Sequence, residues 1–337
     1  MSFRLEDYDF TLPPERIATH PASPRESAKL LVYDRALDRI THATVGDLGS
    51  FIPLNAALIF NNTRVIKARI FGTRNGGGKS ELLFIRPWEE GFLCRIRGKV
   101  RIGSRLVFEA GLEAEVTALK ESGDRLVRFY ENGASIGLDR LLALLEQIGH
   151  VPLPPYIKRS DTRQDERDYQ TRFAKESGSV AAPTASLHFT DALLSQVRGA
   201  HPWAEVTLHV GLGTFAGVEA DDIRRHPMHS ERYRVPAEAA RLIDSAQPLL
   251  AVGTTACRTV EYYARTRQSD GECDLFLHPG NPPVRVNHLM TNFHLPRSTL
   301  IMLVAAFAGL ETTKRLYAEA IERNYRFYSY GDAMLIL

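Results

Sequence analysis

The stretch LLAVGTTACRTVEYYAR, residues 249–265, contains one complete step of an α/β fold. Its first part, residues 249–253, is a continuous apolar run of the length of a short buried strand. Its last part, residues 258–265, has the pattern of a helix, and Thr254 and Thr255 lie between the two. The stretch therefore predicts a strand that leads through a small polar turn into a helix, which is the repeating step of a sheet covered by helices.

The same alternation continues on both sides of this stretch. The further strand-like and helix-like segments are residues 204–210, 236–245, 289–293, 298–308 and 312–324. Near the N-terminus, apolar runs at residues 30–33 and 57–60 predict two more buried strands. We therefore expect an α/β domain that is built from both chain ends, residues 1–67 and 151–337.

Between these two parts the pattern changes to short strands separated by turns. Turn-forming residues recur, as in NGGG at residues 75–78 and ESGD at residues 121–124. Several short strands at this spacing indicate a small antiparallel sheet or barrel. Residues 68–150 are therefore predicted to form an antiparallel β-barrel domain inserted into the α/β domain, with an amphipathic helix at residues 138–148.

The composition is that of a soluble globular protein. Hydrophobic residues make up 44% of the 337 residues and charged residues 24%, which is enough to bury a real core. The three cysteines are far apart and form no C-x-x-C pair, which suits a reducing cytoplasm. The longest apolar run, residues 300–308, is about half of what a membrane-spanning helix needs. We therefore expect a cytoplasmic protein with no membrane partner.

Charge is unevenly distributed along the chain. Residues 64–105 contain 11 Lys and Arg against 3 Asp and Glu, a local excess of eight, whereas the whole chain carries only +2. A basic module on an otherwise acidic protein is expected of a protein that binds the phosphate backbone of a nucleic acid, and a solvated basic face is the alternative. The candidate contacts are Arg64, Lys67, Arg69, Arg97, Lys99 and Arg101.

Two motifs have the small residues that a close ligand requires. VAAPTASLHF at residues 180–189 places Thr184 and His188 in a tight loop around a proline. VTLHVGLGTF at residues 206–215 leads a strand past His209 into Gly211, Gly213 and Thr214. This is half of a nucleotide-binding fingerprint, because the third glycine of G-x-G-x-x-G is missing.

Three more motifs place polar residues beside strands. HPMHSE at residues 226–231 contains His229 and Glu231, but it lacks a marked third ligand, so no metal site is expected. VGTTACR at residues 252–258 and MTNFHLPRST at residues 290–299 each pass from a strand end to a helix start; the second contains Asn292 and His294. Ligands bind beyond the carboxyl ends of strands in open α/β sheets, and anions bind at helix N-termini. Taken singly, these residues fit helix capping; taken together, they predict a shared pocket.

Ten motifs in order resemble the S-adenosylmethionine:tRNA ribosyltransferase-isomerase family of queuosine biosynthesis, from about residue 8 to residue 336. They are FNNTRVIKAR, GHVPLPPYI, DYQTRFA, VAAPTASLHF, VTLHVGLGTF, HPMHSE, VGTTACRTVE, LHPG, TNFHLPRSTLIMLVAAFAG and YRFYSYGDAMLI. Ser186 stands where the family usually has Gly, Lys29 where it usually has Arg, and Asn55-Ala56 where it usually has Gly-Asp. At Ser186 a side chain occupies a point of close backbone approach.

The resemblance implies a transferase that is also an isomerase. Such an enzyme moves the ribosyl part of S-adenosylmethionine onto 7-aminomethyl-7-deazaguanine at the wobble position of tRNA. The ribose rearranges to an epoxycyclopentanediol, giving epoxyqueuosine, and adenine and methionine leave. The resemblance also implies an α/β domain with a β-barrel domain, and a tRNA partner bound through its anticodon loop. We expect no cofactor or metal, since S-adenosylmethionine is a substrate, and we expect a monomer.

This chemistry requires a base near the carbon next to the sulfonium and an acid near the departing adenine. The candidates are His188, His209, His229 and His294, with Glu231 as an alternative base; the sequence leaves open which residue has which role. The candidate substrate-binding residues are Thr184, Gly211, Gly213, Thr214, Thr254, Thr255 and Asn292. Two alternatives are an S-adenosylmethionine-dependent RNA methyltransferase, against which no full glycine-rich loop is present, and a noncatalytic RNA-binding protein.

Overall fold

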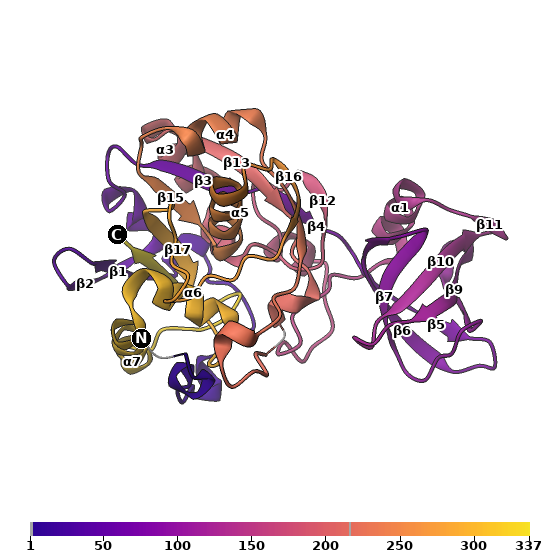
Figure 1. The fold of residues 1–337 in the computed structure, drawn as a ribbon. Coiled ribbons are helices and arrows are strands. Elements are labelled where there is room, and N and C mark those ends of the chain that lie inside the picture. The colour runs from indigo at the N-terminus through magenta and orange to yellow at the C-terminus, as the bar shows by residue number, and fades with distance from the viewer. Residues whose placement is uncertain (1–2, 216) are drawn as a thin grey trace. The chain divides into compact units, whose positions relative to one another are not determined.

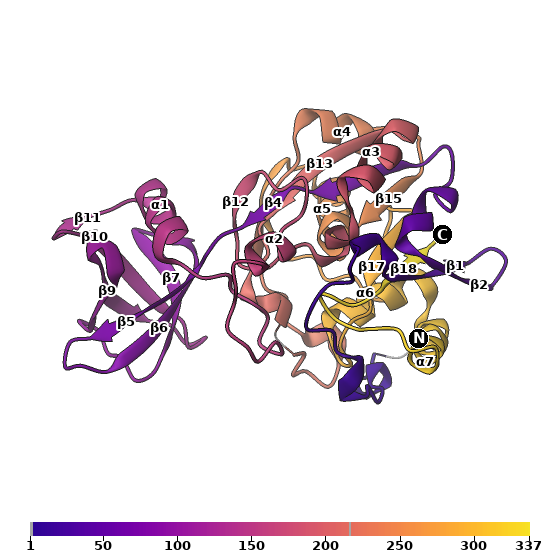
Figure 2. The same ribbon diagram turned by 180° about the vertical axis from the view of Figure 1, so that it is seen from behind.

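The computed structural model describes residues 3–215 and 217–337, with no side-chain description for Thr214 and Phe215. The chain divides into two compact units (Figures 1 and 2). The first comprises Met1–Thr63, Gln170–Glu176 and Ala182–Leu337; the second comprises Arg64–Tyr169 and Ser177–Ala181. The first is an α/β unit and the second a β-barrel, so the predicted fold class is confirmed. The predicted insertion, residues 68–150, lies within the second unit.

The α/β unit is built on a mixed sheet of nine described strands. Their spatial order is β16 (Asp270–Cys273), β14 (Glu231–Arg234), β13 (Trp203–Leu208), β3 (Ala57–Asn61), β15 (Leu249–Val252), β17 (His288–Asn292), β18 (Ala333–Ile336), β1 (Lys29–Asp34) and β2 (Arg39–Thr44). The four neighbours β13, β3, β15 and β17 run parallel. Three of them, β3, β15 and β17, are buried almost throughout, as expected for parallel strands covered on both faces. Their carboxyl ends therefore meet at one edge of the sheet.

Helices cover both faces of this sheet. One face packs against α3 (Asp191–Ala200) and η4 (Val45–Ser50), and the apolar side chains of β1, β3, β15 and β18 form the core there. α5 (Thr254–Thr266) and α4 (Ala237–Asp244) pack on the other face, as the two opposite views show (Figures 1 and 2). The remaining helices of the unit are α6 (Thr299–Ala308), α7 (Leu310–Glu322), η1 (Leu5–Tyr8), η2 (Pro14–Arg16), η3 (Arg25–Ser27), η6 (Thr184–His188), η7 (Leu212–Phe215) and η8 (Ile223–Arg225).

The turn after β15 is tighter than its sequence suggests. The periodicity predicts a helix from residue 258, but α5 begins at Thr254, directly after Gly253. Gly253 has a φ of 96°, which a side chain rarely permits, so the chain reverses from strand to helix with no spacer. Thr254 and Thr255 are therefore the first turn of the helix.

The second unit is a closed antiparallel barrel. Its strands are β5 (Arg69–Arg74), β6 (Lys79–Trp88), β7 (Gly91–Arg97), β8 (Arg105–Val107), β9 (Leu112–Leu119), β10 (Arg125–Glu131) and β11 (Ala134–Ser135), and pairing of β9 with β10 closes it. η5 (Glu109–Gly111), α1 (Leu138–Ile148) and α2 (Asp165–Asp168) belong to the same unit. β4 (Thr63–Val65) and β12 (Glu176–Ser179) pair where the chain passes between the units.

Candidate functional site

The candidate site lies at the edge where four parallel strands end. β3 ends at Asn61 and β17 at Asn292, whereas His209 follows β13 and Gly253 follows β15 (Figure 1). Strand order, which the sequence does not state, brings these residues from four distant segments to one edge. This is the edge at which open α/β sheets bind ligands.

Asn61 joins three of the surrounding elements. Its side-chain nitrogen donates to the carbonyl of Leu208 and to Oγ1 of Thr255, each at 3.0 Å. Its side-chain oxygen accepts from the backbone nitrogens of Leu208 and Thr63. Asn61 is fully buried, so this bonding fixes the ends of β3 and β13 to the first turn of α5. Asn61 lies in the motif FNNTRVIKAR, but nothing local in the sequence indicates that it belongs to the candidate site.

His209 is held at the β13 side of this edge. Its Nδ1 shares a hydrogen bond with Oγ1 of Thr63 at 2.9 Å. Burial lowers the pKa of His209, and the nearby Arg232 lowers it further, while Glu176 acts in the opposite direction. The imidazole is therefore biased toward its neutral form.

His188 and Asn292 meet at the β17 side. η6 contains His188 and packs against β17. Nδ2 of Asn292 lies 3.3 Å from Nε2 of His188, and both residues are buried. Burial, together with the positive charges of Arg326 and Arg25, lowers the pKa of His188 to about 3.

Two buried polar atoms, one on η6 and one on β17, are unsatisfied within the described part of the chain. Oδ1 of Asn292 and Oγ of Ser186 are buried and make no hydrogen bond to any residue that the structure describes. An unsatisfied buried polar atom costs about 1–3 kcal/mol, so each is expected where a ligand supplies the missing group. Thr184 begins the same short helix and is half-buried.

His294 follows the end of β17, two residues after Asn292. Its Nε2 shares a hydrogen bond of 2.7 Å with Oγ1 of Thr291, and its backbone N–H donates to the hydroxyl oxygen of Tyr317 at 3.1 Å. Burial lowers the pKa of His294 to about 3. His188 and His294 are therefore both neutral at pH 7 in the folded protein.

Glu231 is part of a buried ion pair. One of its carboxylate oxygens accepts from the guanidinium of Arg258, and the other accepts from the backbone N–H of Gly211 at 2.9 Å. Arg258 also donates to the carbonyls of Leu275 and Cys273, and it is almost fully buried. This pairing, between residues on β14 and α5, holds the start of the Gly211 loop in place.

The lack of a side chain at Gly213 leaves room for the ring of His229. A side chain on Gly213 would place its Cβ 2.5 Å from the ring of His229, closer than atoms can approach. Gly213 therefore lets the exposed His229 lie against the backbone of η7. The backbone of Thr214 belongs to η7, but its side chain lies outside the described part of the chain.

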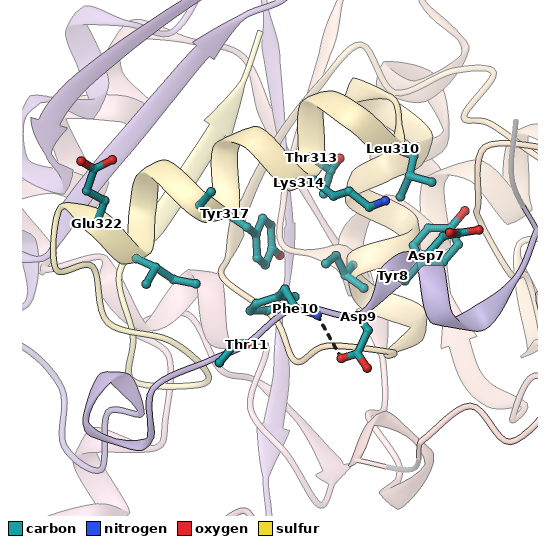
Figure 3. Close-up of a pocket in the computed structure, with 13 residues that line it drawn as sticks. Asp7, Tyr8, Asp9, Phe10, Thr11, Leu310, Thr313, Lys314, Tyr317 and Glu322 are labelled. Carbon is teal, nitrogen blue, oxygen red and sulfur yellow. Dashed lines mark hydrogen bonds between the residues drawn. The ribbon is translucent and has the colours of Figure 1, made fainter.

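A separate pocket of about 360 Å³ lies between the N-terminal segment and α7 (Figure 3). Tyr8 and Phe10 line one side of it, and Leu310 and Tyr317 the other. The hydroxyl of Tyr317 accepts the hydrogen bond from the backbone N–H of His294. This pocket is therefore lined by a residue that holds His294 in place. No local sequence pattern indicates this pocket, because its walls come from opposite ends of the chain.

Acidic residues of the barrel domain offset much of the positive charge of its basic residues. Residues 68–150 carry 13 Lys and Arg against 11 Asp and Glu, so the excess of eight in residues 64–105 is offset within the same domain. Lys67 pairs with Glu146 and Glu166 at 3.3 and 3.1 Å. Arg69 and Arg97 share Glu81 at 3.3 and 3.9 Å.

The remaining candidate contacts in the basic region are more accessible. Arg64, Lys99 and Arg101 are exposed and form no ion pair with the residues that the structure describes. Arg97 is also accessible, with 86% of its side chain exposed. These four cations are therefore the members of the predicted set that a phosphate can reach without breaking a strong internal pair.

Within residues 3–215 and 217–337, no group of three or more His, Cys, Asp and Glu is placed to hold a metal ion. No helix there has both the length and the apolar character to cross a membrane.

Comparison with known proteins identifies the family. The family described as “Queuosine biosynthesis protein” matches residues 5–336. Proteins called S-adenosylmethionine:tRNA ribosyltransferase-isomerase from a Nitratiruptor species and from Campylobacter jejuni (strain RM1221) are 56% and 52% identical to this chain, each match covering 99% of this chain and 98% of the relative. The crystal structure of the S-adenosylmethionine tRNA ribosyltransferase from Thermotoga maritima is similar with a TM-score of 0.56 and 34% identity, covering 98% of this chain and 100% of that one. The chain therefore belongs to the queuosine biosynthesis protein family.

Proposed function

We propose that this protein is an S-adenosylmethionine:tRNA ribosyltransferase-isomerase. It transfers and isomerises the ribosyl part of S-adenosylmethionine onto 7-aminomethyl-7-deazaguanine at the tRNA wobble position, and it releases adenine and methionine. The observation that carries this proposal is the family match over nearly the whole chain, with relatives of that name at 51–56% identity.

The proposed donor site is the strand-end edge of the α/β unit. Its support is the set of polar groups there, including the unpaired Oδ1 of Asn292, and the unpaired Oγ of Ser186 on η6, the short helix that contains His188. The N-terminus of α5, with Thr254 and Thr255, offers backbone N–H groups to the carboxylate of the methionine part. The bond from Asn61 holds Thr255 in position for this contact.

The histidines divide into two groups by burial. A base with a pKa of about 3 accepts a proton from carbon with little driving force, because general bases work best with a pKa near the working pH. We therefore propose that His188 and His294, which are neutral and buried, hydrogen-bond to substrate atoms. His209 or His229 then takes the proton from the carbon next to the sulfonium.

Glu231 is proposed to position the loop and not to act as base. Both of its carboxylate oxygens already accept hydrogen bonds, and proton uptake would weaken the pairing with the buried Arg258. Through the N–H of Gly211 it fixes the path of the loop that leads to Gly213 and His229.

The barrel is proposed to bind tRNA phosphates through Arg64, Arg97, Lys99 and Arg101, and the modified base of the anticodon loop to enter the donor site. A base that undergoes chemistry must be unstacked, and loop bases unstack most easily. We further propose a monomer in the cytoplasm that needs no metal or cofactor. The three buried cysteines are unpaired, as is usual for a reducing compartment.

Product analysis tests the proposed reaction. The purified protein is incubated with S-adenosylmethionine and a tRNA that carries 7-aminomethyl-7-deazaguanine, and the products are separated by chromatography with mass spectrometry. We expect adenine, methionine and epoxyqueuosine in equal amounts. S-adenosylhomocysteine as the product would indicate a methyltransferase instead, and RNA binding without any turnover of S-adenosylmethionine would indicate a noncatalytic RNA-binding protein.

A further inference from the structure

A groove of about 890 Å³ lies on the outside of the barrel. Phe71 of β5 and Val107 of β8 provide its apolar wall, with 51% and 43% of their surfaces exposed. Two large apolar side chains that share a groove and remain half-exposed are unusual on a small domain, and such sites often bind a partner. The volume is within the range of sites that hold a small organic group.

The groove depends on a glycine in β5. A Cβ on Gly72 would lie 2.3 Å from the carbonyl oxygen of Val107 and 2.6 Å from the ring of Phe108. Without a side chain there, β5 and β8 approach closely and bring Phe71 and Val107 to the same groove. The ring of Phe71 packs against His150 at a centroid distance of 5.1 Å and an interplanar angle of 70°, which restrains its orientation.

Positive charge surrounds the apolar wall. Lys79 and Arg97 line the groove and are exposed. Arg74 donates to the carbonyl of Lys99 at 2.9 Å, which ties the loop after β7 to the end of β5 and keeps the exposed Lys99 near this end of the barrel. Cations next to an exposed aromatic ring are the combination that binds single-stranded nucleic acid.

Two carboxylates also line the groove. Glu81 is neutralised by Arg69 at 3.3 Å and by Arg97 at 3.9 Å. Glu109 is exposed and forms no ion pair within the described part of the chain, so it repels phosphate from its own part of the groove. A nucleic-acid backbone would therefore lie along Lys79, Arg97 and Lys99.

We propose that this groove binds an unpaired nucleotide of the tRNA substrate, with its base stacked on Phe71 against Val107 and its phosphates held by Lys79, Arg97 and Lys99. The proposal rests on the proposed function, since it assumes a tRNA substrate. Stacking on an aromatic ring is how proteins hold splayed bases in RNA loops, and it requires no particular base. The groove thereby adds a stacking contact with the loop, which the exposed cations alone cannot make.

Binding measurements on the full chain test the groove. The probe is a fluorescein-labelled anticodon stem-loop RNA that carries 7-aminomethyl-7-deazaguanine, titrated at several salt concentrations. For Phe71→Ala we expect about 5- to 150-fold weaker binding with an unchanged slope of log affinity against log salt, because a stacked base and not a phosphate contact is lost. Phe71→Leu, which keeps an apolar side chain, should also bind weakly, whereas Phe71→Trp should restore binding and its emission should be quenched by the RNA.

Leu119→Ala is the matched control, because Leu119 is 48% exposed on the same barrel and does not line the groove. It should bind RNA like the parent protein. Binding by Phe71→Ala within about twofold of the parent, or full binding by Phe71→Leu, would overturn the stacking proposal while turnover by the parent keeps the proposed function intact. If the parent binds no RNA and releases no adenine, the groove proposal falls together with the proposed function.

Discussion

Nδ2 of Asn292 donates a hydrogen bond to Nε2 of His188 across 3.3 Å, joining the end of β17 to η6 inside the α/β unit. Because an amide nitrogen only donates, Nε2 of His188 accepts, and the ring carries its proton on Nδ1. The pair therefore holds His188 in one neutral tautomer, and it leaves Oδ1 of Asn292 available to a ligand.

Replacement of Asn292 by Leu should impair the donor site. The variant loses both the bond to His188 and the free acceptor, so we expect kcat/KM for S-adenosylmethionine to fall about tenfold or more. Steady-state adenine release measures this, and circular dichroism monitors folding. Asn55→Leu, an exposed change in the same unit, is the control. An unchanged kcat/KM in folded Asn292→Leu would remove this residue from the site.

At least one of the four candidate histidines should be essential. We expect one or more of the variants His188→Ala, His209→Ala, His229→Ala and His294→Ala to lose about a hundredfold or more in turnover while remaining folded, as general acid–base groups usually contribute that much. Adenine release is measured for each. Should all four keep more than about a tenth of the activity, proton transfer belongs to another group, and the proposal that Glu231 is not the base would be the first to revise.

The pKa values of His188 and His294 predict how stability depends on pH. Both fall from 6.5 to about 3 on folding, so the unfolded chain binds protons more readily. Their contribution to stability is complete above about pH 6.5 and declines as the pH falls toward 3. The loss of Tm between about pH 7.5 and pH 5 should therefore be smaller in His188→Asn/His294→Asn than in the parent. Exposed His20→Asn is the control, and an equal loss in all three proteins would contradict the prediction.

The ion pair between Glu231 and Arg258 should stabilise the α/β unit only as a pair. Arg258→Met leaves a buried carboxylate without its partner, which should cost about 3–5 kcal/mol in the free energy of unfolding. The double variant Glu231→Leu/Arg258→Met should lose less than the sum of the two single losses. Urea unfolding followed by Trp203 of this unit, in a Trp88→Phe background, measures the cycle. Additive losses would show that the two side chains do not interact.

Charge reversal on the barrel should weaken tRNA binding. Arg97→Glu/Lys99→Glu should lower the affinity and flatten the salt dependence by roughly 0.7–0.9 for each lost phosphate contact, with little effect on S-adenosylmethionine binding. Lys120→Glu/Arg128→Glu makes the same change in charge at residues already paired with Glu89 and Glu90, and it should change the slope less. If the first variant keeps the parent's affinity and slope, the tRNA contact lies nearer Arg64 or on the α/β unit.

Local sequence patterns were enough to predict the fold class and most of the segments that form the candidate site. Apolar runs that end in small or polar residues are local patterns, and strand and helix formation depends largely on such patterns. The resemblance of ten motifs likewise needed only their order along the chain, and the family match confirmed it.

Which of these residues meet, and which charges surround them, depends on the tertiary structure. Asn61 belongs to the site because β3 lies between β13 and β15, and Glu231 is held by Arg258, 27 residues further along the chain. The basic run of residues 64–105 is partly neutralised by carboxylates that lie beyond it in the sequence: Lys67 pairs with Glu146 and Glu166, Arg95 with Asp124, and Arg105 with Glu115. Strand order, buried pairing and charge compensation depend on contacts between residues that are distant in the sequence, and local periodicity does not indicate such contacts.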